Sequence, residues 1–187
     1  MQNNFSARRI ALLGALLSIS LVLAVVESML GALIPLPIPG VKLGLANIVS
    51  MFLLCYFSLP SALIVGLLRT FLASLFTGGF GMFLYSAPGA LLSILVMAAV
   101  LKGFKALTLA GVSMTGACVH NLAQVCVAVL LTGETHLFYY GFVLLGVGAV
   151  SGAITGLVAQ VTFGRAAGAL NLRPQEISIR RAHIGGV

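Results

Sequence analysis

The sequence predicts an all-α integral membrane protein with six transmembrane helices and both termini on the cytoplasmic side. Of the 187 residues, 60% are hydrophobic and only 7% are charged, and the mean hydropathy is +1.18. A soluble domain of this length carries far more charge. The apolar residues form several long runs, and roughly 20 helical residues cross a hydrocarbon core of about 30 Å. The chain is therefore expected to lie in a lipid bilayer.

The first two predicted spans cover residues 10–26 and 43–59. The first resembles a signal peptide, but it has no convincing small-x-small cleavage site before Glu27, so we expect it to remain as a helix. Three prolines at every second position make residues 34–40 a loop, because proline removes backbone donors and favours extended backbone.

The next segments alternate between turns and spans. Pro60 fits the first turn of a third span at residues 62–76. Glycine and aromatic residues predict a loop at 77–85, since glycine allows unusual backbone angles and the rings suit the membrane interface. The last three spans are expected at residues 88–101, 107–131 and 138–163.

The last span carries a glycine repeat and leads into a polar tail. Its glycines recur every fourth residue, which is typical of a face where helices pack closely; they are Gly148, Gly152 and Gly156. We expect residues 1–165 to form one transmembrane domain. Residues 166–187 are expected to form a basic cytoplasmic tail that is partly disordered.

The basic residues predict the orientation. With six spans, eight of the ten basic residues fall on one side of the membrane, and they are Arg8, Arg9, Lys102, Lys105, Arg165, Arg173, Arg180 and Arg181. By the positive-inside rule this side is cytoplasmic, and an odd number of spans would break the agreement. Basic residues scattered at segment ends indicate topology, so no nucleic-acid partner is expected.

The three cysteines give no sign of a disulfide or a metal site. Cys55, Cys118 and Cys126 all fall inside predicted spans, without a C-x-x-C pair or a histidine at ligand spacing. Neither feature is therefore expected, and we interpret the cysteines as small buried apolar residues.

The fifth predicted span carries an unusual polar group of side chains. His120, Asn121 and Gln124 are three or four residues apart, so on a helix they project from one side. Arg69, near the centre of the third span, and Lys42, at the outer start of the second, are the basic residues that topology does not explain. Polar and charged groups inside a membrane are costly and face protein or a water-filled cavity.

A crude estimate of depth along each helix, from the rise per residue, places these side chains at similar levels in the membrane. They could therefore converge on one cavity that opens outward. The candidate ligand-binding residues are Glu27, Lys42, Asn47, Arg69, His120, Asn121 and Gln124. The set is rich in donors and carries a surplus of positive charge, which suits phosphate or carboxylate. Alternatives remain open: an interfacial Glu27–Lys42 ion pair, an Asn47 bond to a neighbouring backbone, or a polar cluster that holds helices together.

Three motifs resemble the Gx transporter family, which is also labelled heptaprenyl diphosphate synthase component I. They are the Lys-Leu-Gly-Leu-Ala-Asn-Ile run from Lys42, the Leu-Leu-Arg run that ends at Arg69, and the stretch from Thr115 to Gln124. The resemblance covers residues 10–163. More loosely, the six-span layout and the Ala11-x-x-x-Ala15 motif resemble the substrate-capture (S) components of energy-coupling factor transporters.

The second resemblance implies a mechanism. An S component captures a small anionic or vitamin-like compound from outside in a bacterial cytoplasmic (inner) membrane, then docks on a scaffold and ATPase subunits. Here Arg69, His120, Asn121 and Gln124 would line the pocket, and Ala11 with Ala15 would form the docking face. The chain has no G-x-x-x-x-G-K-[ST] loop, so ATP-driven transport needs partner subunits.

The family's other label implies prenyl diphosphate chemistry, which depends on Asp-rich motifs that hold magnesium. The sequence contains no aspartate, and its three glutamates are far apart in depth. We therefore expect no enzyme activity and no cofactor. A non-catalytic membrane subunit associated with polyprenyl diphosphate synthesis remains an alternative, as does a purely structural subunit.

Overall fold

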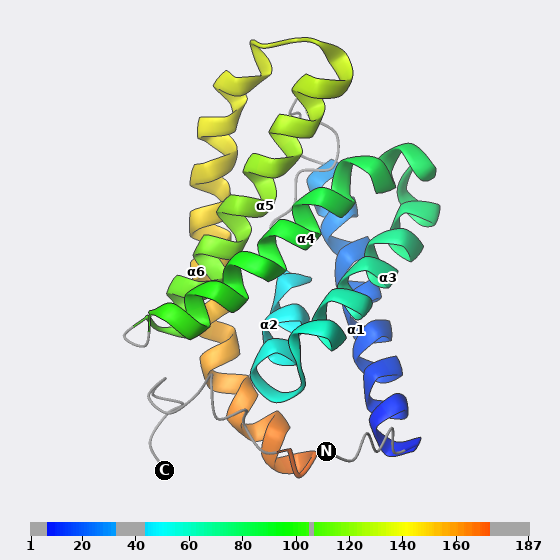
Figure 1. Cartoon of the computed structure of the whole chain (residues 1–187), viewed down its shortest axis with the longest axis vertical. Coiled ribbons are helices and arrows are strands. Elements are labelled where there is room, and N and C mark those ends of the chain that lie inside the picture. Colours follow the sequence, from blue (N-terminus) through cyan, green and yellow to red (C-terminus); the bar gives the residue numbers. More distant parts are fainter. Residues whose placement is uncertain (1–6, 33–43, 105–106, 173–187) are drawn as a thin grey trace.

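The computed structural model describes residues 7–32, 44–104 and 107–172, and within these ranges it is entirely helical (Figure 1). The helices are α1 (Ala7–Ala32), α2 (Asn47–Tyr56), α3 (Leu59–Thr77), α4 (Phe80–Gly103), α5 (Leu109–Thr132) and α6 (Leu137–Ala169). The predicted fold class, an all-α membrane protein, is confirmed. Lys42 and most of the predicted tail lie outside the described residues.

Five helices, all except α2, are long and apolar enough to cross a membrane. The 10 residues of α2 extend only about 15 Å, half of a hydrocarbon core of about 30 Å. The second of the six helices is therefore shorter than the span predicted at residues 43–59. The helix starts late because Gly44 has a positive φ of 86°, and it ends early because Ser58 is extended and caps α3 by accepting a hydrogen bond from Ser61.

The short α2 nevertheless preserves the predicted alternation of chain direction. Nη2 of Arg8, at the start of α1, donates a hydrogen bond of 2.7 Å to the carbonyl of Leu170, just after α6. The guanidinium of Arg9 lies 5.9 Å from the ring centroid of Phe57, just after α2. The start of α1 and the ends of α2 and α6 therefore lie together, at the lower end of the bundle in Figure 1.

Helix α4 starts earlier than predicted, so most of the predicted glycine and aromatic loop at 77–85 is helical. Gly78 and Gly79, with φ of 153° and 75°, complete the turn between α3 and α4 by themselves. The aromatic rings pack across this hairpin, with the Phe71 and Phe83 centroids 5.6 Å apart in a T-shaped pair. Ring packing against α3 explains why this segment folds as helix.

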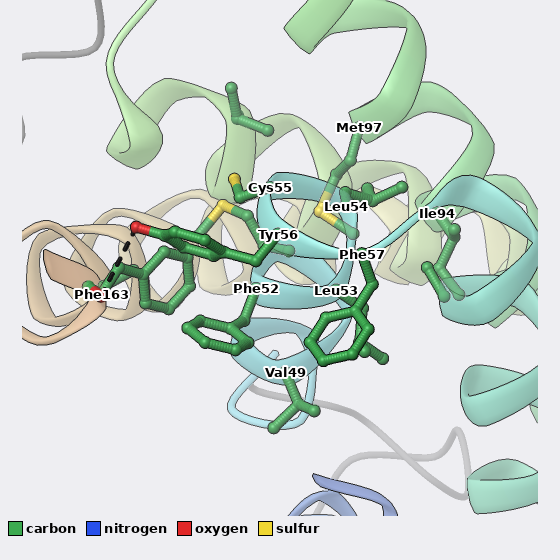
Figure 2. Close-up of a cluster of buried hydrophobic side chains, with 14 of the residues drawn as sticks. Val49, Phe52, Leu53, Leu54, Cys55, Tyr56, Phe57, Ile94, Met97 and Phe163 are labelled. Carbon is green, nitrogen blue, oxygen red and sulfur yellow. Dashed lines mark hydrogen bonds between the residues drawn. The ribbon is translucent and has the colours of Figure 1, made fainter. Parts of the chain in front are cut away.

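The short helix α2 lies at the centre of the bundle, with nine of its ten residues buried. Figure 2 shows its Phe52 and Tyr56 side chains against Phe163 of α6. The rings of Phe52 and Phe163 form a T-shaped pair at 5.1 Å, and the Tyr56 hydroxyl donates to the Phe163 carbonyl at 3.5 Å. This apolar core fixes the C-terminal half of α2 and so positions its polar first residue, Asn47.

The glycine repeat of α6 packs directly against α5, as predicted. A Cβ at Gly152 would lie 2.7 Å from Cα of Met114, and one at Gly148 would lie 2.9 Å from Nδ2 of Asn121. Backbone contact this close requires glycine, because there is no room for a side chain. The repeat therefore brings α6 within hydrogen-bonding reach of the polar residues on α5.

Candidate functional site

Five of the seven predicted ligand-binding residues line one small cavity, although they come from four helices. They are Glu27 of α1, Asn47 of α2, Arg69 of α3, and His120 and Asn121 of α5. All five are buried, with exposed fractions between 1% and 5%. Residues far apart in sequence thus meet in the protein interior, as the depth estimate allowed.

The cavity is much smaller than a ligand pocket. The space open to the centre of a water molecule is about 10 Å³, which is room for about one water. Gly44, Ala46 and Ala117 are the other described residues of the wall. The turn before α2 lies against α5 beside this cavity. The expectation of a pocket open to the outside stays a prediction, because the loop that leads into this turn lies outside the described residues.

Glu27 binds the main chain of this turn. Its Oε1 accepts a hydrogen bond from the backbone N–H of Gly44. The φ of 86° at Gly44 suits glycine, and a Cβ there would also lie 3.4 Å from Cβ of Ala117. Glu27 is thus buried inside the protein. The alternative of an interfacial ion pair with Lys42 stays open, because Lys42 lies outside the described residues.

Arg69 binds the same turn from the opposite helix. Its Nη1 donates a hydrogen bond of 2.6 Å to the carbonyl of Ala46, and the Glu27 carboxylate is close enough to attract it electrostatically. One carboxylate and one guanidinium balance the formal charge of the described cavity wall. The predicted surplus of positive charge therefore depends on Lys42, which the structure does not describe.

Asn121 connects the cavity to α6 and leaves one acceptor open. Its Nδ2 donates to the carbonyl of Leu144 at 3.0 Å, which fixes the orientation of the amide. Among the described residues, none donates a hydrogen bond to its buried Oδ1. A buried acceptor without a donor is costly, so this atom is ready to bind water or a ligand hydroxyl or N–H group.

The other two residues of the α5 group occupy different surroundings. The ring of His120 is seated against α4, since a Cβ at Gly89 would lie 3.3 Å from its Cδ2 and Cε1. Gln124 is buried one turn further along α5, but it is not part of the wall of this cavity. Sequence reasoning missed the wall residues Gly44 and Ala46, although a glycine at the start of an apolar run was a usable signal.

The predicted docking face of α1 is uncovered in the isolated chain. Ala11 and Ala15 are exposed, and a Cβ at Gly14, on the same face, would meet no atom within 4 Å. The face is therefore available to a partner helix or to lipid.

A second, larger space lies along α6. This apolar groove of about 660 Å³ is lined almost entirely by carbon atoms of Leu45, Val143, Gly146, Val147, Val150, Ser151, Ile154 and Thr155. Leu45 belongs to the turn whose neighbouring residues, Gly44 and Ala46, line the polar cavity. One short backbone segment therefore contributes to both spaces.

Fold and site together define a multi-pass α-helical membrane protein with a buried polar cavity. Residues 16–162 match the family model of heptaprenyl diphosphate synthase component I, which is well over half of the chain. The chain therefore belongs to this family, and the resemblance to the Gx transporters, the family's other label, is confirmed. No curated protein and no solved structure matches the chain. The looser resemblance to S components stays a prediction.

Proposed function

We propose that the chain is the substrate-capture subunit of a transporter in the bacterial cytoplasmic membrane, for a small anionic or vitamin-like compound. The observation that supports this function is the convergence of five buried polar side chains from four helices on one cavity. Ionisable residues inside a membrane are costly to bury and mark ligand sites and pathways.

Two details favour a ligand-binding site over a polar cluster that only holds helices together. Glu27 and Arg69 each bind the backbone of a three-residue turn rather than a neighbouring helix. Asn121 Oδ1 has no donor among the described residues, whereas polar groups that only join helices are expected to satisfy each other. The one-water volume then corresponds to a closed state of the site, and capture requires the wall to move.

The proposal also includes partners and excludes catalysis by this chain alone. The exposed Ala11 and Ala15 are suited to docking on an energy-coupling scaffold that carries ATPase subunits, because small residues let helices approach closely. The chain has no aspartate for a magnesium-diphosphate site. Two of its glutamates lie in different surroundings. Oε2 of the exposed Glu134 lies 3.2 Å from Nε2 of His136, whereas Glu27 is buried in α1.

A binding experiment on the full-length purified protein tests the capture function. Small molecules that co-purify are identified by mass spectrometry and then titrated against the protein. We expect Arg69→Ala and His120→Ala each to weaken binding by about tenfold or more, since a lost hydrogen bond to a charged or buried group costs about 1.5 kcal/mol or more.

Ser93→Ala is the matched control, because Ser93 is a fully buried polar residue that is not part of the cavity wall. It should bind the compound as the unaltered protein does. Unchanged affinity in both Arg69→Ala and His120→Ala would show that the compound binds elsewhere.

A second candidate is a non-catalytic membrane subunit associated with polyprenyl diphosphate synthesis. The family's description and the apolar groove on α6, which suits a hydrocarbon chain, favour it. In this case a soluble prenyl synthase should co-purify with the chain, and mixing the two should raise product formation. If no such enzyme associates and product does not rise, this candidate is wrong.

A further inference from the structure

We propose that Gly89 of α4 is a positioning residue of the site, because it fixes the place of the His120 ring in the wall of the polar cavity. Gly89 lies outside the described cavity wall, and nothing in its sequence surroundings pointed to a role in binding. The proposal rests on the capture function and deepens it, since it names a second helix on which the placement of a binding side chain depends.

Gly89 contacts both the main chain and the ring of His120. A Cβ built on Gly89 would lie 3.0 Å from the His120 carbonyl oxygen and 3.3 Å from ring atoms Cδ2 and Cε1. Carbon atoms pack best at about 3.5–4.0 Å, so the histidine already fills the space that a side chain at position 89 would need. Both residues are buried. The α4 backbone therefore holds the ring from one side.

The flat face of the imidazole, rather than its edge, lies against Gly89. Cδ2 and Cε1 are the two carbons on either side of Nε2, and they are the ring atoms nearest to the Cβ position. A Cβ in front of the Nε2 edge would be closer to that nitrogen than to either carbon. Ring nitrogens form hydrogen bonds in the plane of the ring, so Gly89 supports the imidazole without blocking either nitrogen.

A side chain at position 89 would move the ring within the site. The ring would have to shift by a few tenths of an ångström to admit a Cβ. The cavity that His120 helps to line has room for about one water, and binding groups work only when they are held to within about 0.5 Å. Glycine at position 89 is therefore a requirement of the site as well as of helix packing.

A second glycine contact between the same two helices offers a matched comparison. Gly116 lies one helical turn before His120 on α5, and a Cβ built on it would lie 2.6 Å from Sδ of Met97 and 3.2 Å from Oγ of Ser93, both on α4. Neither of these side chains is part of the described cavity wall. Gly116→Ala therefore disturbs the contact between α4 and α5 at residues other than His120.

Nuclear magnetic resonance of the ring tests the positioning without any bound compound. In the full-length chain, His136→Gln and His183→Gln leave His120 as the single histidine, so ring-labelled histidine reports on this residue alone in detergent micelles. We expect Gly89→Ala to shift the His120 ring signals and Gly116→Ala to leave them in place. Equal shifts in the two variants, or no shift in either, would overturn the proposal.

A double-mutant cycle tests whether the position of the ring matters for capture. Gly89→Ala should weaken binding of the co-purifying compound by about three- to tenfold, the range for a disturbed hydrogen bond. In His120→Ala protein the same change should weaken binding by less than about twofold, because the ring through which it acts is gone. Gly116→Ala should have the same effect in both backgrounds. An equal loss from Gly89→Ala with and without the ring overturns the proposal.

Two further outcomes keep this proposal separate from folding and from capture. Should Gly89→Ala not fold, the addition of His120→Ala should restore folding, because it removes the ring that meets the new Cβ, and a double variant that stays unfolded overturns the proposal. Ring signals that shift as expected in a protein that binds no compound support the positioning of His120 and remove the capture function alone.

Discussion

Gly152→Ala is expected to destabilise the protein by about 3 kcal/mol, at the upper end of the usual cost of overpacking a core. The added Cβ would lie 2.7 Å from Cα and 3.0 Å from the backbone N of Met114. These are main-chain atoms of a spanning helix, so no side-chain rotation relieves the clash, and α5 and α6 must separate. Thermal unfolding of the purified protein in detergent, followed by circular dichroism, measures the change.

Gly146→Ala is the matched control for this substitution. It changes the same residue type on the same helix, but its added Cβ meets no atom within 4 Å. We expect its unfolding temperature to equal or slightly exceed that of the unaltered protein, because alanine favours helix over glycine by about 1 kcal/mol. Equal losses in the two variants would mean that the glycine repeat is not a close packing face.

Arg69→Ala is expected to have the largest effect on stability, a loss of about 3–5 kcal/mol in the free energy of unfolding. It removes from Glu27, which is 1% exposed, the guanidinium that attracts its carboxylate among the described residues. Glu27→Ala should cost a similar amount, because Arg69 is then left alone. Unfolding in mixed micelles with increasing denaturing detergent measures both losses.

The double variant Glu27→Ala/Arg69→Ala decides whether the two charges are coupled. We expect its loss to be smaller than the sum of the single losses by more than about 1 kcal/mol, since both charges of the described cavity wall are then removed together. The pair would prove independent if the single losses simply added. Asn47→Ala, in the same cavity wall but uncharged, is the control and should cost less than either single charge substitution.

The polar residues of the site could be predicted from the sequence because their burial in a membrane is so costly. His120 and Asn121 stood on one stripe of an apolar segment, and Arg69 was the basic residue near a span centre. Depth along each helix follows from the rise per residue, so residues of similar depth could be grouped without knowing the packing. The structure brings these residues together around one cavity.

The sequence could not show how closed the cavity is. The apolar run at residues 43–59 has the composition of a span, and the same composition suits a helix buried within the bundle, as nine of ten residues in α2 are. The positive φ of Gly44 is followed by a late start of α2 at Asn47, and the neighbouring sequence does not specify the backbone angles of a glycine. Gln124 was grouped with His120 by helical spacing, but spacing does not show how far along the stripe the cavity extends.

The prediction of a loop at residues 77–85 was wrong for a related physical reason. Glycine and aromatic residues are typical of interfacial loops, yet two glycines are enough for the turn between α3 and α4. The rings of Phe71 and Phe83 instead form a T-shaped pair across the two helices. Tertiary packing therefore extended a helix that local composition would end.

A structure of the full-length protein with its co-purifying compound bound would decide whether the polar cavity captures a ligand. We expect ligand density between α1, α3 and α5, with an acidic group on Arg69 and a donor within hydrogen-bond distance of Asn121 Oδ1. Density in the apolar groove of α6, beside Val143 and Ile154, with Glu27 still bound to the Gly44 N–H and Arg69 to the Ala46 carbonyl, would contradict capture at this cavity.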